Sequence, residues 1–168
     1  MLSNSQAGQD KWILSLFKKG YKGTFLDIGC GKPKDINNTL LLEQKGWNGY
    51  SIDLLNYSEQ WTTRKSKFIQ ADALTYNYNE LQLPEIIDYL SLDIEGEGLR
   101  FQALKRVCDF GLKFKAITIE HDSYRGYQKT EAEPQRILLH LSGYKLIKMD
   151  VKHKGLPFED WWINPEYF

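Results

Sequence analysis

Residues 24–31 read Thr-Phe-Leu-Asp-Ile-Gly-Cys-Gly, and this stretch decides the fold. Its first five residues form a strand-like apolar run. The glycines that follow let the backbone approach a ligand closely and adopt positive φ angles, which a Cβ would oppose. Residues 37–45 then carry three consecutive leucines and stop at Gly46, as a helix does. The stretch therefore predicts one strand–helix unit with a tight glycine turn.

The same alternation of strand-like and helix-like blocks continues along the chain. The expected strands are residues 24–28, 49–54, 67–71, 87–94, 114–120, 144–151 and 156–163. The expected helices are residues 6–19 with Ser5 as N-cap, 37–45, 58–65, 98–110 and 133–141. Strands separated by helices require right-handed crossovers and a mostly parallel sheet. Because the last two strands form a hairpin, we predict a Rossmann-like α/β fold with seven strands, an antiparallel last strand and helices on both faces.

Length and charge restrict the class of function. A chain of 168 residues suffices for one domain with a buried core, so we expect residues 1–168 to form a single domain. Lys plus Arg equals Asp plus Glu at 22 each, so no global field attracts a polyanion or an anionic membrane. This balance disfavours nucleic acid and membranes as partners and favours a small neutral or mixed-charge molecule.

The chain start and the cysteines indicate the compartment. Polar residues occupy positions 3–6, and no run approaches the ~18 apolar residues of a membrane helix. Cys30 and Cys108 have neither the spacing of a zinc site nor that of a disulfide framework. We therefore expect a cytoplasmic protein.

The glycine turn and the acids behind it suggest a nucleotide-bearing ligand. Ligands of parallel sheets bind beyond the carboxyl ends of the strands, where most of the predicted strands carry an acid. Lys34 stands where a dinucleotide fingerprint has its third glycine, which argues against a pyrophosphate, and an ordinary turn remains an alternative. Asp53 follows Gly31 by about 20 residues, the spacing at which a carboxylate reaches ribose hydroxyls. Asp72 and Ala73 could meet an adenine amino group, although Asp72 also suits a plain turn.

Several short blocks, in their order and spacing, resemble the FkbM family of methyltransferases. They are residues 5–10 (SQAGQD), 25–29 (FLDIG), 38–39 (NT), 46–53 (GWNGYSID) and 92–96 (LDIEG), with Gly143-Tyr144 after a helix that starts near Pro134. The resemblance spans nearly the whole chain. It implies the class I methyltransferase fold, S-adenosyl-L-methionine (SAM) as cofactor, and methylation of a hydroxyl group, often on a sugar or a polyketide-type product.

The resemblance also implies which residues bind the cofactor. They come from the chain start and from the ends of the first three strands: Gln6, Gly8, Asp27, Gly29, Gly31, Asp53, Leu54, Asp72 and Ala73. The glycine turn with Asp27 would line the methionine part, Asp53 the ribose, and Asp72 the adenine. Gln6 and Gly8 would close over the site. Where relatives commonly carry Glu then Pro after the second strand, this chain has Asp then Leu, which shortens the carboxylate by one methylene.

Methyl transfer from a sulfonium needs alignment, and an alcohol acceptor also needs a group to take its proton. The candidate catalytic residues are Asp93, Glu95 and His121, of which His121 has the best-suited pKa. Simpler interpretations are that Glu95 stabilises a helix start and that His121 is a hydrogen-bonded strand-end residue. Acids and His121 around positions 93 and 120–122 could also hold a divalent cation. Because such acids are common in this fold without an ion, we predict no metal.

The loop at residues 123–129 follows the fifth strand and would overhang the site. Together with Asp122, its residues Tyr124 and Arg125 are the candidate contacts for a small-molecule or glycan acceptor, although the loop could be a plain connection. A domain this small could also complete its site as a homo-oligomer.

Three alternatives remain open. The first is a methyltransferase-like binding module without catalysis. The second, an NAD-dependent oxidoreductase, lacks the third glycine, and the helical Tyr-Lys pair it needs is represented only by Tyr144 and Lys148 on an expected strand. The third is an RNA methyltransferase, for which Arg64, Lys65 and Lys67 form the only dense basic cluster, a pattern more typical of a solvated face.

Overall fold

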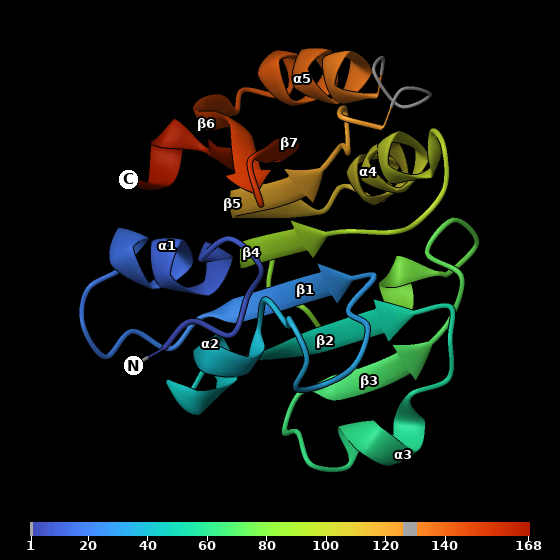
Figure 1. Ribbon diagram of the computed structural model, residues 1–168. Helices are drawn as coiled ribbons and strands as arrows, with labels where there is room; N and C mark the ends of the chain where they lie inside the picture. The colour runs from blue at the N-terminus through green and yellow to red at the C-terminus, as the bar shows by residue number, and fades with distance from the viewer. Residues whose placement is uncertain (1, 126–130) are drawn as a thin grey trace.

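A seven-stranded sheet runs through the computed structural model, which describes residues 2–125 and 131–168 (Figure 1). Its strand order is β3-β2-β1-β4-β5-β7-β6. The strands are β1 (Thr24–Ile28), β2 (Asn48–Asp53), β3 (Lys67–Gln70), β4 (Ile86–Leu92), β5 (Lys113–Glu120), β6 (Lys145–His153) and β7 (Leu156–Ile163). β7 pairs antiparallel with both β5 and β6, and the other strands run parallel. The predicted sheet is confirmed.

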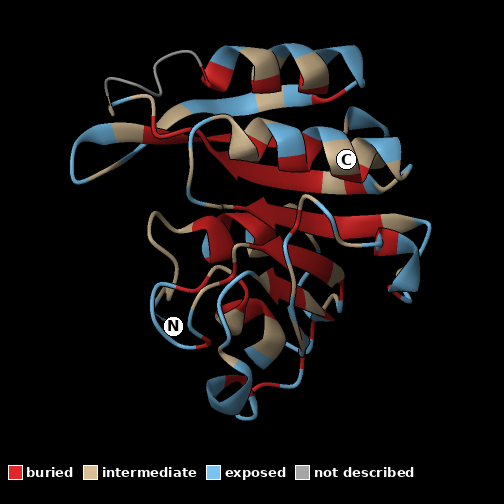
Figure 2. Cartoon of the chain, turned by 90° about the vertical axis from the view of Figure 1, so that its right-hand side faces the viewer, coloured by how far each residue is buried: buried red, intermediate tan, exposed pale blue. Residues whose placement is uncertain are grey.

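Helices cover both faces of this sheet. They are α1 (Gln9–Leu16), α2 (Leu40–Gln44), α3 (Ser58–Trp61), α4 (Leu99–Asp109) and α5 (Ala132–Leu141), with short 3-10 helices η1 (Tyr78–Glu80) and η3 (Pro165–Tyr167). One core cluster joins α1 and α2 to the sheet, and a second joins α4, α5 and η1 to its other face. Figure 2 shows this arrangement: the strands are mostly buried, and the helices expose their outer sides. No helix among the described residues is long and apolar enough to span a membrane.

The first helices are shorter than their sequence predicts, and polar loop contacts explain two of them. α1 begins after Gly8, whose φ of 86° is left-handed, so Ser5 is not the N-cap. The Ser5 hydroxyl instead donates to Asp10 at 2.9 Å. α2 begins at Leu40 because the Asn37 side-chain oxygen accepts the Leu40 N–H at 2.9 Å and holds the preceding residues in a turn. The expected helix over 58–65 ends at Trp61. The expected helices and strands all form, and the bounds of β1 and β7 are as predicted, but the bounds of these first three helices were wrong, and η1 and η3 were not predicted.

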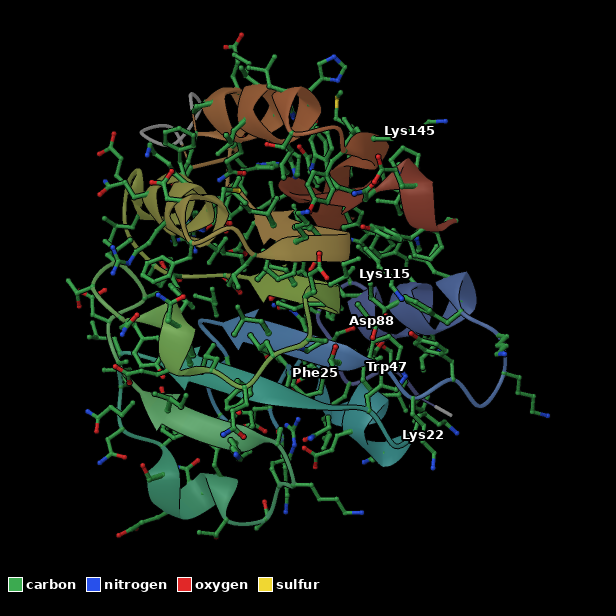
Figure 3. The ribbon with its side chains drawn as sticks, turned by 180° about the vertical axis from the view of Figure 1, so that it is seen from behind. Lys22, Phe25, Trp47, Asp88, Lys115 and Lys145 are labelled. Carbon is green, nitrogen blue, oxygen red and sulfur yellow. The ribbon has the colours of Figure 1, made fainter. Side chains whose placement is uncertain are left out.

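The amino and carboxyl ends of the parallel strands carry different contacts. At the amino ends of the strands, Asp88 accepts the Thr24 N–H at 2.8 Å and pairs with Lys115 at 2.7 Å (Figure 3). At the carboxyl ends, parallel pairing sets Ile28 opposite both Ile52 and Leu92, so β1, β2 and β4 end side by side. The residues that follow these three strands therefore lie close together, at the carboxyl ends of the parallel strands.

Candidate functional site

A cavity of about 460 Å³ opens at the carboxyl ends of β1 to β4. Its lining residues are Gly29, Gly31, Ile52, Asp53, Leu54, Leu55, Tyr57, Ala71, Asp72, Ala73, Leu74, Asp93, Ile94, Glu95 and Leu99. Six of the nine predicted cofactor contacts lie here, together with two of the three candidate catalytic residues. A larger cavity of about 660 Å³ lies between α5 and the β6–β7 hairpin and contains none of these residues.

The glycine turn after β1 is held close to its neighbours. The Gly29 N–H donates to the Ile52 carbonyl at 2.8 Å, and the Gly31 N–H donates to an Asp53 carboxylate oxygen at 2.8 Å. Gly29 has a φ of 78°, and a Cβ there would lie 1.7 Å from the Asp93 carbonyl oxygen. Only glycine fits this position, because a side chain would collide with the end of β4. The open backbone beside it is a cradle that a ligand can approach.

Two of the predicted nucleoside contacts, Asp53 and Asp72, are carboxylates in the cavity lining. The Asp53 oxygens accept the N–H groups of Gly31 at 2.8 Å and Leu55 at 2.9 Å. Each oxygen can accept a further hydrogen bond, so a ribose diol can still bind. Asp72 accepts the Leu74 N–H at 2.8 Å through one oxygen, which is the turn-forming role. Its other oxygen and the Ala73 N–H take no part in that turn, so both are available for an adenine edge.

The apolar part of the cavity was largely missed by sequence reasoning. Leu55, Tyr57, Leu74, Ile94 and Leu99 line it with the predicted Leu54. Such side chains provide a slot for a flat ring between the polar contacts. The available signal was their position, because four of them follow a strand end within four residues and Leu99 is the first residue of α4. Apolar residues are common after strands, so this signal is weak without the structure.

Three predicted cofactor residues lie outside the cavity lining. Asp27 is only 2% exposed, accepts the Thr39 hydroxyl at 3.0 Å, and ties the loop before α2 to β1. Burial raises the pKa of the Asp27 carboxyl to about 6. The Gln6 carbonyl lies 3.2 Å from His153 Nδ1 in the β6–β7 hairpin, and Gly8 starts α1. The cofactor contacts assigned to Asp27, Gln6 and Gly8 therefore stay predictions.

A buried ionic cluster lies behind the cavity, at the ends of β5 and α4. Arg100 is fully buried and contacts Glu120 at 3.0 Å, Asp122 at 3.1 Å and Glu131 at 3.3 Å. Its guanidinium contacts Glu120 and Asp122, two of the four residues considered as ligands of a divalent cation. Burial, followed by the hydrogen bond with Asp93, raises the pKa of Glu120 to about 10. Burial also raises the pKa of Asp93, while the hydrogen bond with Glu120 and the charge of Arg100 act in the opposite direction.

His121 points away from the cavity. Its ring is fully buried, and the Ser123 N–H donates to Nδ1 at 3.1 Å. Nε2 lies 3.5 Å from oxygens of both Asp150 and Asp160. These three side chains could bracket a metal ion, but Arg136 already contacts Asp150 at 2.7 Å. The structure thus brings Asp93 and Glu95 to the cavity but not His121, whose catalytic role stays a prediction.

The predicted acceptor contacts form a bridge at the cavity rim. Arg125 lies 3.1 Å from Glu95 and 3.0 Å from Asp122, so it connects the loop after β5 with the cavity. Asp122 is 1% exposed and also pairs with Arg100, whereas Tyr124 is 38% exposed. Residues 126–129 of the predicted acceptor loop lie outside the described residues.

The arrangement of the sheet, with order β3-β2-β1-β4-β5-β7-β6 and an antiparallel β7, is the Rossmann-like class I methyltransferase fold. No family model and no curated protein matches the chain, so membership of the FkbM family is not confirmed. Solved structures share the fold. A candidate rRNA methylase from Clostridium thermocellum superposes with a TM-score of 0.64 at 14% identity, over 97% of this chain and 98% of its own.

Two further structures with this fold contain the product of SAM-dependent methylation, S-adenosylhomocysteine (SAH). One is the 1,6-didemethyltoxoflavin-N1-methyltransferase of Burkholderia thailandensis, with a TM-score of 0.58, 13% identity, and coverage of 94% of this chain and 77% of that one. The other is a candidate methyltransferase from Streptococcus mutans, with a TM-score of 0.61, 13% identity, and coverage of 97% and 99%. At identities this low, the superpositions establish the shared fold alone.

Proposed function

We propose that this protein is a SAM-dependent methyltransferase. The observation that carries the proposal is the order of groups along one cavity: the glycine turn, then Asp53, then Asp72 with Ala73. These groups match the amino-acid, ribose and adenine parts of SAM. The class I fold and the SAH found in two proteins that share it support the same assignment.

The residues present fit the cofactor. Gly29 and Gly31 present bare backbone to the cavity, Asp53 retains acceptor capacity for a diol, and the apolar side chains around Tyr57 provide a slot for the purine. When bound, SAM supplies an activated methyl group on a sulfonium. The protein's task is then to hold an acceptor in line with that group, because alignment provides much of the rate enhancement in such transfers.

The finer proposal is methylation of a hydroxyl group on a sugar, a glycan or a small natural product. Asp93 and Glu95 lie at the open end of the cavity, where a carboxylate can take the hydroxyl proton as the oxygen–carbon bond forms. Arg125 and Tyr124 are placed beside Glu95 to contact the acceptor. Carboxylates at this rim repel phosphates, which supports a small acceptor over nucleic acid.

Calorimetric titration with SAH and, in parallel, with NAD tests the proposal. We expect SAH to bind and NAD not to bind, and binding of NAD alone would overturn the assignment. Asp53→Ala should weaken SAH about tenfold or more, because it removes the ribose contact. Asp109→Ala is the matched control, since this exposed acid pairs with Lys105 on α4 and lies outside the cavity lining. Equal affinities in the two variants would reject the ribose assignment.

A further inference from the structure

The charged side chains that line the cofactor cavity are all acidic. Four carboxylates line it, from Asp53, Asp72, Asp93 and Glu95, and the described lining contains no Lys, Arg or His. Arg125 pairs with Glu95 at the rim and compensates that acid. Asp93 has no such partner in the lining: its side chain interacts with Glu120 and, behind the cavity, with the shared Arg100. Asp93 is therefore the lining acid at the end of β4 that could attract a cationic ligand.

We propose, resting on the proposed function, that Asp93 with Glu120 behind it makes this site favour the cationic methyl donor over its neutral product. SAM and SAH share the adenosine and the amino-acid groups and differ by the methylsulfonium charge. A residue that acts on this charge changes the affinity for one ligand and leaves the other nearly unaffected. Asp93 then determines how readily the product leaves as well as how the donor binds.

The position of Asp93 follows from the assignment of the other groups. With adenine at Asp72 and ribose at Asp53, the sulfur lies toward the remaining end of the cavity, formed by the glycine turn and β4. Asp93 is in contact with that turn, because its carbonyl oxygen lies 1.7 Å from where a Gly29 Cβ would be. The sulfonium is thus brought to the Asp93 end of the site.

The buried cation behind this end is shared among several acids. Arg100 contacts Glu120, Asp122 and Glu131 and also acts on Asp93, so one guanidinium serves four carboxyl groups. A cation bound beside Asp93 favours the ionised form of this carboxyl group. Such a charge acts strongly on a nearby cation, because few waters screen it in a partly buried site.

Transfer of the methyl group removes the attraction. The sulfur–carbon bond breaks, the sulfur keeps the electron pair and becomes a neutral thioether, and the methyl carbon forms a bond to the acceptor oxygen. The acceptor's proton passes to a carboxylate. The product left beside Asp93 no longer carries the sulfonium charge, so its release is favoured relative to that of the donor.

Titration of SAM and SAH without acceptor, on the wild type and on charge variants, tests this inference. The double variant Asp93→Asn/Glu120→Gln removes the charge of the pair, and we expect it to weaken SAM by about tenfold and SAH by less than about twofold. Sinefungin, in which a carbon-borne ammonium replaces the methylsulfonium, should behave like SAM. Equal weakening of SAM and SAH would overturn the proposal.

Two control variants separate charge from structure. Glu120→Gln alone keeps the Asp93 carboxyl group, so the preference for SAM over SAH should persist. Asp72→Asn removes an acid at the adenine end and should weaken both ligands by the same factor. If the double variant does not fold, the wild type still decides, because rising ionic strength must weaken SAM more than SAH. Equal salt dependence contradicts the inference, whereas failure of both ligands to bind contradicts the proposed function itself.

Discussion

The carboxyl ends of β1–β4 and the neighbouring region of β5 and the antiparallel β7 carry the same kinds of residue and use them differently. At the ends of β1–β4, Asp53 and Asp72 line a cavity and keep acceptor capacity for a ligand. At the end of β5 and in the adjacent part of β7, Glu120 and Asp160 are buried and bonded to arginines. Acids at strand ends are therefore not a functional signal alone. What distinguishes the two halves is whether the protein itself neutralises the charge.

Residues on the covering helices make this difference. α4 supplies Arg100 and α5 supplies Arg136, and each guanidinium contacts at least two carboxylates at the ends of the last strands. Among the described residues, the lining at β1–β4 contains no Lys, Arg or His, and Arg125 reaches only Glu95 at its rim. The glycine turn leaves backbone in place of side chains there. We call the region at the ends of β1–β4 the open half, because its cavity can accept a ligand. We call the region of β5–β7 the closed half, because internal ion pairs of Arg100 and Arg136 fill it.

Gly29→Ala should have the largest effect, because the new side chain would displace the glycine turn that lines the cavity of the open half. The new Cβ would lie 1.7 Å from the Asp93 carbonyl oxygen and the residue would keep a φ of 78°, so β1 and β4 must separate. We expect no measurable SAH binding by calorimetry and a loss of more than about 3 kcal/mol in unfolding free energy. Retention of binding would show that the turn does not cradle the ligand.

Gly31→Ala is the matched control for this substitution. Gly31 also has a positive φ, of 58°, but a Cβ there meets nothing within 4 Å. The cost should be only the backbone strain of about 1–2 kcal/mol. If both alanine variants lose the same stability, the close approach of Gly29 to β4 is not the cause.

Arg100→Met should have the next largest effect, because it removes the buried cation of the closed half. The substitution leaves Glu120, Asp122 and Glu131 without their buried cation. Removing one partner of a buried ion pair costs about 3–5 kcal/mol, which urea unfolding would measure. Lys105→Met is the control on the same helix: its pair with Asp109 is exposed, so the change should stay within about 0.5 kcal/mol. Similar losses in both variants would contradict the closed-half interpretation.

More of the open half than of the closed half could be predicted from the sequence. The strands were predictable because apolar runs such as residues 24–28 are local, and the turn glycines with Asp53 and Asp72 follow directly from strand ends. The neutralisation of Glu120 was not predictable, since it depends on Arg100, which lies 20 positions earlier and on a helix. His121 was chosen for its chemistry, but the Ser123 contact and the burial that isolate it from the cavity are tertiary.

Glu159→Gln should change the pH dependence of stability. Burial raises the pKa of Glu159 to about 8 from an ordinary value of 4.5, so the native state holds a proton that the unfolded state releases between these pH values. Wild-type stability therefore falls as pH rises through this window. The glutamine variant lacks this titration, and its loss of unfolding free energy from pH 5 to pH 8 should be smaller by on the order of 3 kcal/mol. Equal pH slopes in urea titrations would show that Glu159 titrates normally.

His121→Gln should have the smallest effect and decides to which half this residue belongs. Its ring contacts Ser123 and faces Asp150 and Asp160, all outside the cofactor cavity. We expect a loss of about 1–2 kcal/mol in unfolding free energy, from imperfect replacement of a buried ring. SAH affinity should stay within about twofold of the wild type. A loss of affinity as large as that of Asp53→Ala would place His121 in the open half, because a side chain confined to the closed half has no contact through which to weaken the ligand.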